Sequence, residues 1–329
     1  MIYLLKENRV RRSYIGGARI DRFYGRSDAK NGYYPEDWIG SVVEAKNPQY
    51  FVSKEGLSYV EEGILLRDII SCNPQEVIGM DKMPILLKML DSAERLVIQA
   101  HPTVQFAKKN FSSDFGKTEC WYFIECEKDA CVYIGFKPNV TKERWKLLFE
   151  KQDAKGMLNC LHRFSVKPGD FVFVDGGVPH AIGGGSLMLE LQEPTDLMVC
   201  AERVTPSGVA LSDEKVHGGL GFDLMLDCFE YKNFTEEEAF SHFFVKPKQY
   251  NTKKVLIDSD ITNKFNMSEI YCGEHMSKNF MLAIVVNGEG NIVSETGRKK
   301  IKKGDRLFIS KGEKFNLEGT DFRVIVCEA

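Results

Sequence analysis

Four side chains with metal-binding chemistry stand at the ends of predicted strands in the middle of the chain. His101 ends one such strand and His180 follows another. Gln99 lies two residues before His101, so that a strand directs both side chains to one face. Glu119 opens a strongly apolar segment, where a carboxylate is costly to bury unless it is paired or coordinated. Two imidazoles, a carboxylate and an amide oxygen suit Zn²⁺ or another borderline divalent ion, with positions left open for water or substrate.

The same residue types also occur in structural positions and in iron-binding sites. A lone histidine at a strand end is most often structural, whereas two of them beside a carboxylate favour a shared site. Two histidines and a carboxylate also form the facial triad of non-haem iron oxygenases. Gln99 argues against an oxygenase, because a fourth ligand would close a position that oxygen needs.

The elements that must position these side chains are mostly short strands. Aromatic and β-branched residues predict strands at 117–126 and 130–137, which the turn EKDA joins as a hairpin. Further strands are predicted at 94–101, 169–177 and 186–204. Helices are predicted at 83–94, 102–111, 141–164 and 235–244, with Thr141 as the N-cap of the third.

An internal repeat sharpens the prediction of the fold class. Segment 166–185, VKPGDFVFVDGGVPHAIGGG, is similar to segment 301–320, IKKGDRLFISKGEKFNLEGT. Many short strands with glycine-rich turns favour a sandwich or barrel, and the repeat predicts two copies of one β-sandwich module. Phe315 takes the place of His180 in the second copy, so we expect that module to have lost the role of this histidine.

Composition narrows the class of protein. The chain has 329 residues, of which 43% are hydrophobic, which predicts a sizeable core in one large domain or two closely packed ones. Its formal net charge of −3 gives no basic field for nucleic acid. No apolar run approaches the roughly 18 residues of a membrane span, and the run before Lys6 is too short for a secretory signal, so a cytoplasmic protein is expected.

The number and spacing of the cysteines also fit a cytoplasmic protein. The nine cysteines are odd in number and include no C-x-x-C pair, which argues against a disulfide framework and a cysteine zinc knuckle. Most of them lie in apolar segments and are expected to act as small core residues. The sequence does not indicate an oligomeric state.

The motifs together resemble a known family. VIQAHPTVQFAKKN, GKTECWYFI, the segment 166–185 and LELQEPTD resemble the type I mannose-6-phosphate isomerases in their short bacterial form. The resemblance implies a mainly β fold, a cupin (jelly-roll) β-sandwich in two modules with a few short helices. It implies a catalytic cupin domain at 1–240, a second, degenerate module at 241–329, and one zinc ion per chain. The implied metal ligands are Gln99, His101, Glu119 and His180.

The resemblance also implies which residues contact the substrate. Lys117 of the GKTE motif, Glu190 and Asp196 match pocket residues of the family. The chain departs from the family at Cys200, where the family has a pocket arginine. Arg203 is a candidate replacement, but its odd offset directs it to the opposite face of a strand unless a bulge restores the register.

The implied reaction interconverts mannose 6-phosphate and fructose 6-phosphate. A proton leaves C2 of the open aldose and returns at C1 through a cis-enediol, with zinc as the Lewis acid. Glu190 is the expected base, with a metal-bound water as the competitor, and Lys117 is expected to neutralise charge on the sugar or its phosphate. A cupin that binds a sugar phosphate without turnover is the rival interpretation, which Cys200 favours.

Overall fold

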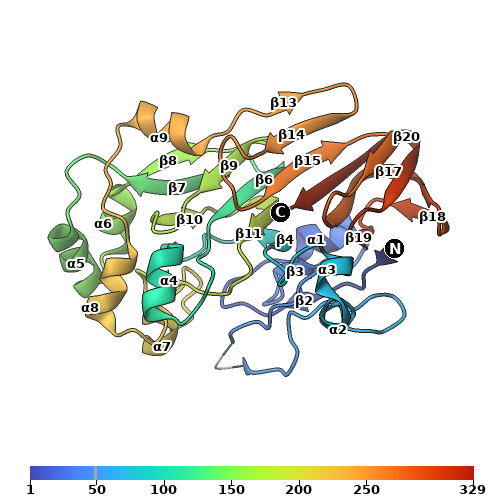
Figure 1. Cartoon of the computed structure of the whole chain (residues 1–329). Helices are drawn as coiled ribbons and strands as arrows, with labels where there is room; N and C mark the ends of the chain where they lie inside the picture. Colours follow the sequence, from blue (N-terminus) through green and yellow to red (C-terminus); the bar gives the residue numbers. More distant parts are fainter. Residues whose placement is uncertain (48–49) are drawn as a thin grey trace.

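Antiparallel strands make up more of the structure than helices do, which confirms the predicted mainly β class (Figure 1). The computed structural model describes residues 1–47 and 50–329. Its strands form sheets of six, five and nine strands. These sheets position the residues of the candidate metal centre.

The six-stranded sheet is the central layer. In spatial order its strands are β2 (Arg9–Val10), β3 (Glu36–Ile39), β4 (Leu86–Ser92), β11 (Ser186–Gln192), β6 (Glu119–Cys126) and β9 (Phe171–Val174). The five-stranded sheet faces one side of it. In spatial order this sheet has β12 (Val199–Cys200), β5 (Gln99–Ala100), β10 (His180–Ile182), β7 (Cys131–Phe136) and β8 (Leu161–Ser165).

The central sheet is buried on both faces, and this decides where Glu119 points. On β6, Trp121 packs with Val132 of the five-stranded sheet. Cys120 and Tyr122 pack in the core that the central sheet shares with the nine-stranded sheet. Because side chains alternate along a strand, Glu119 faces the same side as Trp121, into the sandwich.

The predicted hairpin between 117–126 and 130–137 is wrong. β6 pairs with β9 and β11, whereas β7 pairs with β8 and β10. The turn EKDA therefore carries the chain from one sheet of the sandwich to the other. Residue composition predicted both segments correctly as strands. It does not specify which strand, distant in the sequence, each of them pairs with.

The helix predicted at 83–94 is also wrong, because the segment contains strand β4. All seven residues of β4 are buried, so no polar alternation marks it as a strand, and a short apolar run resembles a buried helix. The single helix predicted at 141–164 is instead two helices, Lys142–Glu150 and Ala154–Asn159, and the helical segment ends early because β8 begins at Leu161. Its N-cap is confirmed, because the Thr141 hydroxyl accepts a hydrogen bond from the Arg144 amide.

The remaining helices are short and lie mostly outside the sheets (Figure 1). They are α1 (Ala18–Phe23), α2 (Leu66–Cys72), α3 (Pro74–Val77), α4 (Val104–Asn110), α5 (Lys142–Glu150), α6 (Ala154–Asn159), α7 (Asp213–His217), α8 (Phe222–Met225), the 3₁₀ turn η2 (Leu226–Cys228) and α9 (Glu236–Phe243). Helices α4 and α9 confirm the predictions at 102–111 and 235–244.

The nine-stranded sheet joins the two ends of the chain. It contains β1 (Ile2–Leu4), β13 (Lys248–Gln249), β14 (Lys253–Ile257), β15 (Asn266–Ile270), β16 (Gly273–Met276), β17 (Met281–Ser294), β18 (Gly297–Lys302), β19 (Arg306–Ile309) and β20 (Lys314–Glu328). β1 pairs with β19, so the blue N-terminal strand lies beside the red C-terminal strands (Figure 1). The division into two modules at residue 240 stays a prediction. Strand β1 comes from the first predicted module but belongs to the sheet of the second.

The two copies of the repeat have the same local backbone. Gly169 (φ 91°) precedes β9 and Gly304 (φ 94°) precedes β19, and both are left-handed. The glycines that follow these strands, Gly177 and Gly312, are also left-handed, at φ 89° and 72°. A positive φ is strained for any residue with a Cβ, so the repeated glycines are turn requirements.

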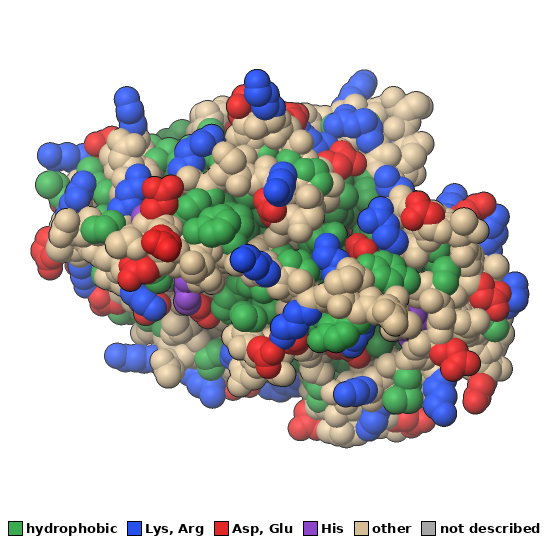
Figure 2. Space-filling model, turned by 90° about the horizontal axis from the view of Figure 1, so that it is seen from above, with side chains coloured by type: hydrophobic (Ala, Val, Ile, Leu, Met, Phe, Trp, Pro, Cys, Tyr) green, Lys and Arg blue, Asp and Glu red, His purple; other side chains and the backbone are tan. Residues whose placement is uncertain are grey.

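The surface carries both signs of charge. On the face seen from above in Figure 2, lysine and arginine side chains are interspersed with aspartate and glutamate. In the described part of the chain, no helix is both long and apolar enough to cross a membrane.

Candidate metal centre and its cavity

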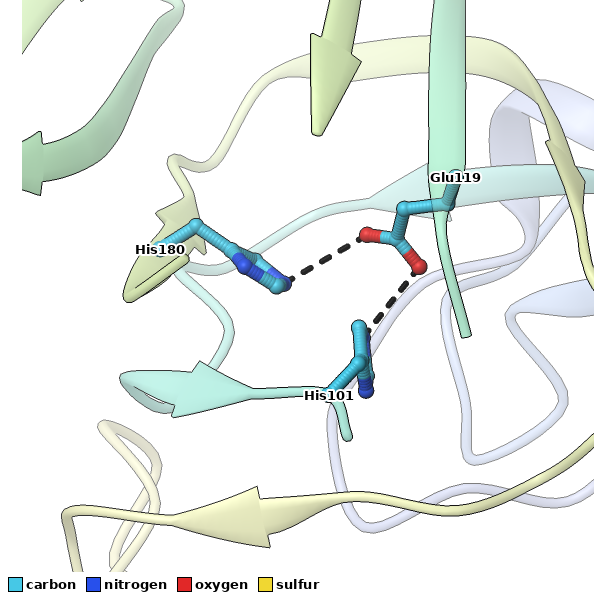
Figure 3. A group of neighbouring side chains, drawn as sticks. All are labelled: His101, Glu119 and His180. Atoms are coloured by element: carbon cyan, nitrogen blue, oxygen red, sulfur yellow. Dashed lines mark ion pairs between the residues drawn. The ribbon is translucent and has the colours of Figure 1, made fainter. Parts of the chain in front are cut away.

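Two imidazoles and a carboxylate meet inside the sandwich. His101 follows β5, His180 begins β10, and Glu119 enters from β6 on the facing sheet (Figure 3). Nε2 of His101 lies 3.2 Å from Oε2 of Glu119, and Nε2 of His180 lies 3.4 Å from Oε1. At most 2% of any of the three residues is exposed, so water cannot solvate this carboxylate. The three groups are close enough to share one ion.

The hydrogen bonds of the rings set their tautomers. Nδ1 of His101 lies 3.0 Å from the Leu197 carbonyl, and Nδ1 of His180 lies 2.9 Å from the Val178 carbonyl. A carbonyl oxygen only accepts hydrogen bonds, so both Nδ1 atoms carry the proton. In neutral rings both Nε2 atoms then present lone pairs toward Glu119. Backbone carbonyls orient metal-binding histidines in this way.

Burial keeps both rings neutral. It lowers the pKa of His101 to about 4, with the nearby Lys117 charge acting in the same direction. Burial likewise lowers the pKa of His180. For Glu119, burial alone would raise the pKa, but Lys117 and the imidazoles hold it well below its usual range. At neutral pH the cluster is therefore two unprotonated imidazole nitrogens facing an ionised carboxylate, an arrangement that favours a cation between them.

Lys117 and Gln99 complete this group. The Lys117 ammonium donates hydrogen bonds to Glu119 and to Nε2 of His101, the latter at 2.7 Å. The Gln99 amide nitrogen lies 3.2 Å from Nε2 of His180. Rotating the amide by 180° exchanges its nitrogen and oxygen, which would present Oε1 beside His180 instead. The donor set therefore fits a divalent ion with three or four protein ligands.

A cavity opens from this group, and Glu190 lies on its wall. Gln99, His101, Lys117 and Glu190 all line it. Glu190 is opposite Lys88 in the register of β11 and β4, and the Lys88 ammonium donates to Oε1 of Glu190 at 2.9 Å. The Lys117 ammonium lies 4.0 Å from the same oxygen. Glu190 thus stands next to the metal-binding group with its carboxylate held by a neighbouring strand.

A second ionic group holds Asp196 on the same cavity wall. The Arg12 guanidinium donates to both Asp196 oxygens at 3.0 Å and to Glu36 at 2.9 Å. Glu36 also accepts from the Tyr14 hydroxyl and the Trp38 indole, each at 2.7 Å. Burial alone would raise the pKa of Glu36, but Arg12 and Lys88 lower it to about 2. Asp196 is therefore engaged by Arg12 and oriented by it.

The structure does not bring Arg203 into the cavity. Its guanidinium stacks 4.2 Å from the ring centre of Phe222 and lies 3.9 Å from Asp213. Cys200, by contrast, lines the cavity and pairs with Gln99 across β12 and β5. β12 ends at Cys200, so Arg203 lies beyond the paired residues and strand alternation does not set its direction.

Several cavity residues escaped prediction from the sequence. Lys88 is a buried charge in an apolar strand, which could have marked it as a site residue. The segment 83–94 was predicted as a helix, so this lysine was not placed in a buried strand. Arg12 lies in the run RVRRSY, where nothing distinguishes it from solvated neighbours. Lys215 reaches the cavity from α7, far along the chain from the motifs.

Fold and site together define a cupin-type sandwich with a buried metal-binding cluster. No family model matches the chain. Over 246 residues, 73% of each chain, it is 32% identical to mannose-6-phosphate isomerase ManA of Bacillus subtilis (strain 168). It therefore belongs to the mannose-6-phosphate isomerase family.

Solved structures agree in fold. The crystal structure of the mannose 6-phosphate isomerase from Bacillus subtilis has a TM-score of 0.76 at 23% identity, covering 100% of this chain and 99% of that one. A mannose 6-phosphate isomerase bound with zinc and yttrium has a TM-score of 0.70 at 15% identity, and each chain is 99% covered. The resemblance seen in the sequence motifs is thereby confirmed.

The Arg12 group gives a prediction about pH. Its lowered carboxyl pKa values stabilise the wild type above about pH 4.5, and this contribution is lost as pH falls toward 2. Replacing Arg12 by Met leaves two buried carboxylates without their main partner. We expect a loss of about 3–5 kcal/mol in the free energy of unfolding at pH 7.5. The loss should shrink at pH 4.5, where the variant can protonate these carboxylates.

Urea denaturation of the metal-free protein at the two pH values measures the effect. Arg26→Met is the matched control, because Arg26 pairs with Glu7 at the surface and should cost less than about 1 kcal/mol at either pH. An equal loss for Arg12→Met at pH 7.5 and pH 4.5 would contradict the role given to Arg12.

Proposed function

We propose that this protein is a metal-dependent aldose–ketose isomerase that interconverts mannose 6-phosphate and fructose 6-phosphate through a cis-enediol. The observation that carries the proposal is one cavity that adjoins the metal-binding cluster and holds a buried carboxylate, Glu190, with Lys117 between them. Membership of the family and the activity named for its relative in Bacillus subtilis support the choice of substrate.

The proposed metal ligands are Gln99, His101, Glu119 and His180, which would hold one Zn²⁺. The unprotonated Nε2 atoms beside an ionised carboxylate support this set, and a structural neighbour contains zinc. When bound, the ion supplies a Lewis acid that polarises the carbonyl of the open-chain sugar.

Glu190 is the proposed base. Isomerisation moves a proton from C2 to C1, and one carboxylate close to both carbons can accept and return it. Lys88 donates to one oxygen of Glu190, which leaves the other free to take the proton. Lys88 is thus a positioning residue that keeps this carboxylate directed at the cavity.

Lys117 and Asp196 have supporting roles in the proposal. The Lys117 ammonium can donate a hydrogen bond to a sugar oxygen and offset negative charge that develops there. Asp196, fixed by Arg12, can accept from sugar hydroxyls. Arg203 has no role in this proposal, because its guanidinium is engaged by Phe222 outside the cavity.

The second module is proposed to serve packing. Residues 241–329 carry Phe315 where the first copy has His180, and Phe315 is buried in an apolar cluster. His275, which stacks near Phe315, bonds to the Tyr271 carbonyl. A degenerate cupin module that covers the central sheet accounts for these features.

The metal prediction compares two histidines. Protein purified without chelators should hold about one zinc ion per chain, and His180→Ala should hold less than about a tenth of that. His275→Ala is the matched control and should keep the full content. Elemental analysis measures both, and a His180→Ala protein with an undiminished zinc content would refute the ligand set.

The catalytic prediction concerns Glu190. A coupled assay should detect conversion of mannose 6-phosphate, and Glu190→Gln should lower kcat by about 10²–10⁴ while zinc content is unchanged. Glu127→Gln is the matched control, since Glu127 is also paired with a cation, Arg19, but is exposed outside the cavity.

Two outcomes would count against the proposed reaction. Wild-type protein that binds mannose 6-phosphate without converting it would favour a binding protein. A normal kcat in the Glu190→Gln variant would mean that another group is the base.

A further inference from the structure

The cations of the cavity divide into two groups by their partners. Arg12, Lys88 and Lys117 each contact a buried carboxylate within 3.0 Å. Arg11 and Lys215 also line the cavity, and within the described residues neither side chain forms an ion pair, although the Lys215 charge is near enough to help lower the pKa of Asp196. A phosphate dianion is bound best by cations that no carboxylate has already neutralised.

Burial places these two cations at the mouth of the cavity. His101, Lys117 and Glu190 on its lining are at most 4% exposed and mark its buried end, the floor. Arg11 and Lys215 are half-buried, so they border solvent while their charges remain on the cavity lining. A sugar phosphate that reacts at C1 and C2 on the floor would extend its C6 phosphate toward the mouth.

Aromatic side chains hold Arg11 in place. Its guanidinium lies 3.9 Å from the ring centre of Tyr50 and 5.2 Å from that of Tyr33. Its buried Nε has no hydrogen-bond partner among the described residues. Stacking orients the guanidinium plane and leaves its N–H groups for a ligand, which is the arrangement that suits bidentate recognition of phosphate.

Lys215 is placed by α7 next to Cys200. Ser212 caps this helix by accepting from the Lys215 amide, and the buried Val216 anchors it in the core. The Cys200 sulfur lies 4.0 Å from the Lys215 carbonyl. Cys200 and Lys215 are therefore neighbours on the cavity lining.

We propose that Lys215 and Arg11 bind the phosphate group of the substrate, with Lys215 supplying the positive charge that position 200 lacks. This inference rests on the proposed function for the identity of the sugar. It assigns the specificity for a phosphorylated sugar to residues outside the family motifs, one from the start of the chain and one from α7.

The test measures binding without turnover. Mannitol 1-phosphate has no carbonyl group and cannot isomerise, and mannitol is the same molecule without phosphate. Calorimetric titration of the full-length, zinc-loaded protein should give at least about tenfold tighter binding of the phosphate. Lys215→Met and Arg11→Met should each weaken that binding by about ten- to a hundredfold and leave mannitol binding within about twofold.

Two controls distinguish charge from structure. Lys215→Arg keeps the positive charge and should retain binding within about threefold. Lys155→Met removes an exposed lysine of α6 and should bind as the wild type does. Thermal unfolding and zinc content should be unchanged in all variants.

The outcomes separate this inference from the proposed function. Wild-type affinity in Lys215→Met, or an equal loss for mannitol and its phosphate, would overturn the phosphate assignment even if isomerase activity is present. The expected losses in a protein without isomerase activity would uphold the assignment while the proposed reaction failed.

Discussion

The Glu119 carboxylate, buried between two imidazole nitrogens that carry no proton, is the constraint on which the rest of the site depends. An ionised carboxylate without water needs positive charge, and neutral imidazoles supply none. Four buried carboxylates lie on or beside the cavity wall, those of Glu36, Glu119, Glu190 and Asp196. The buried cations that contact them in the described structure are three, those of Arg12, Lys88 and Lys117. Lys117 pairs with Glu119 and Lys88 with Glu190, whereas Glu36 and Asp196 share Arg12. A divalent ion beside Glu119 would add the positive charge that the two neutral imidazoles do not supply.

The sandwich explains how such a cluster can persist. Glu119 comes from the central sheet, whereas His101 and His180 come from the facing sheet, so closing the two layers brings the ligands together. Carbonyl groups of the backbone fix both rings before any ion binds. Lys88 and Glu190 are cross-strand neighbours in the central sheet. The geometry of the reaction centre is therefore set by strand register, and loops contribute the mouth of the cavity.

The sequence indicated that His101, Glu119 and His180 would lie together, which the structure shows, because their chemistry is local. Buried polar residue types at strand ends are visible without knowledge of the partners, and the repeat marked the turns around β9 and β19. Prediction failed where the outcome depends on long-range pairing. β4 has no alternation because both its faces are buried, so its lysine went unrecognised. Lys215 is brought in by a helix whose position no local pattern encodes.

The location of the metal tests the central claim most directly. Crystals of the protein, grown without chelators, can be measured at wavelengths on either side of the zinc absorption edge. We expect one anomalous peak per chain within about 2.0–2.2 Å of nitrogen or oxygen atoms of His101, His180 and Glu119, with Gln99 beside it. A fully ordered cluster with no peak, in protein that is active and contains no metal, would contradict this expectation.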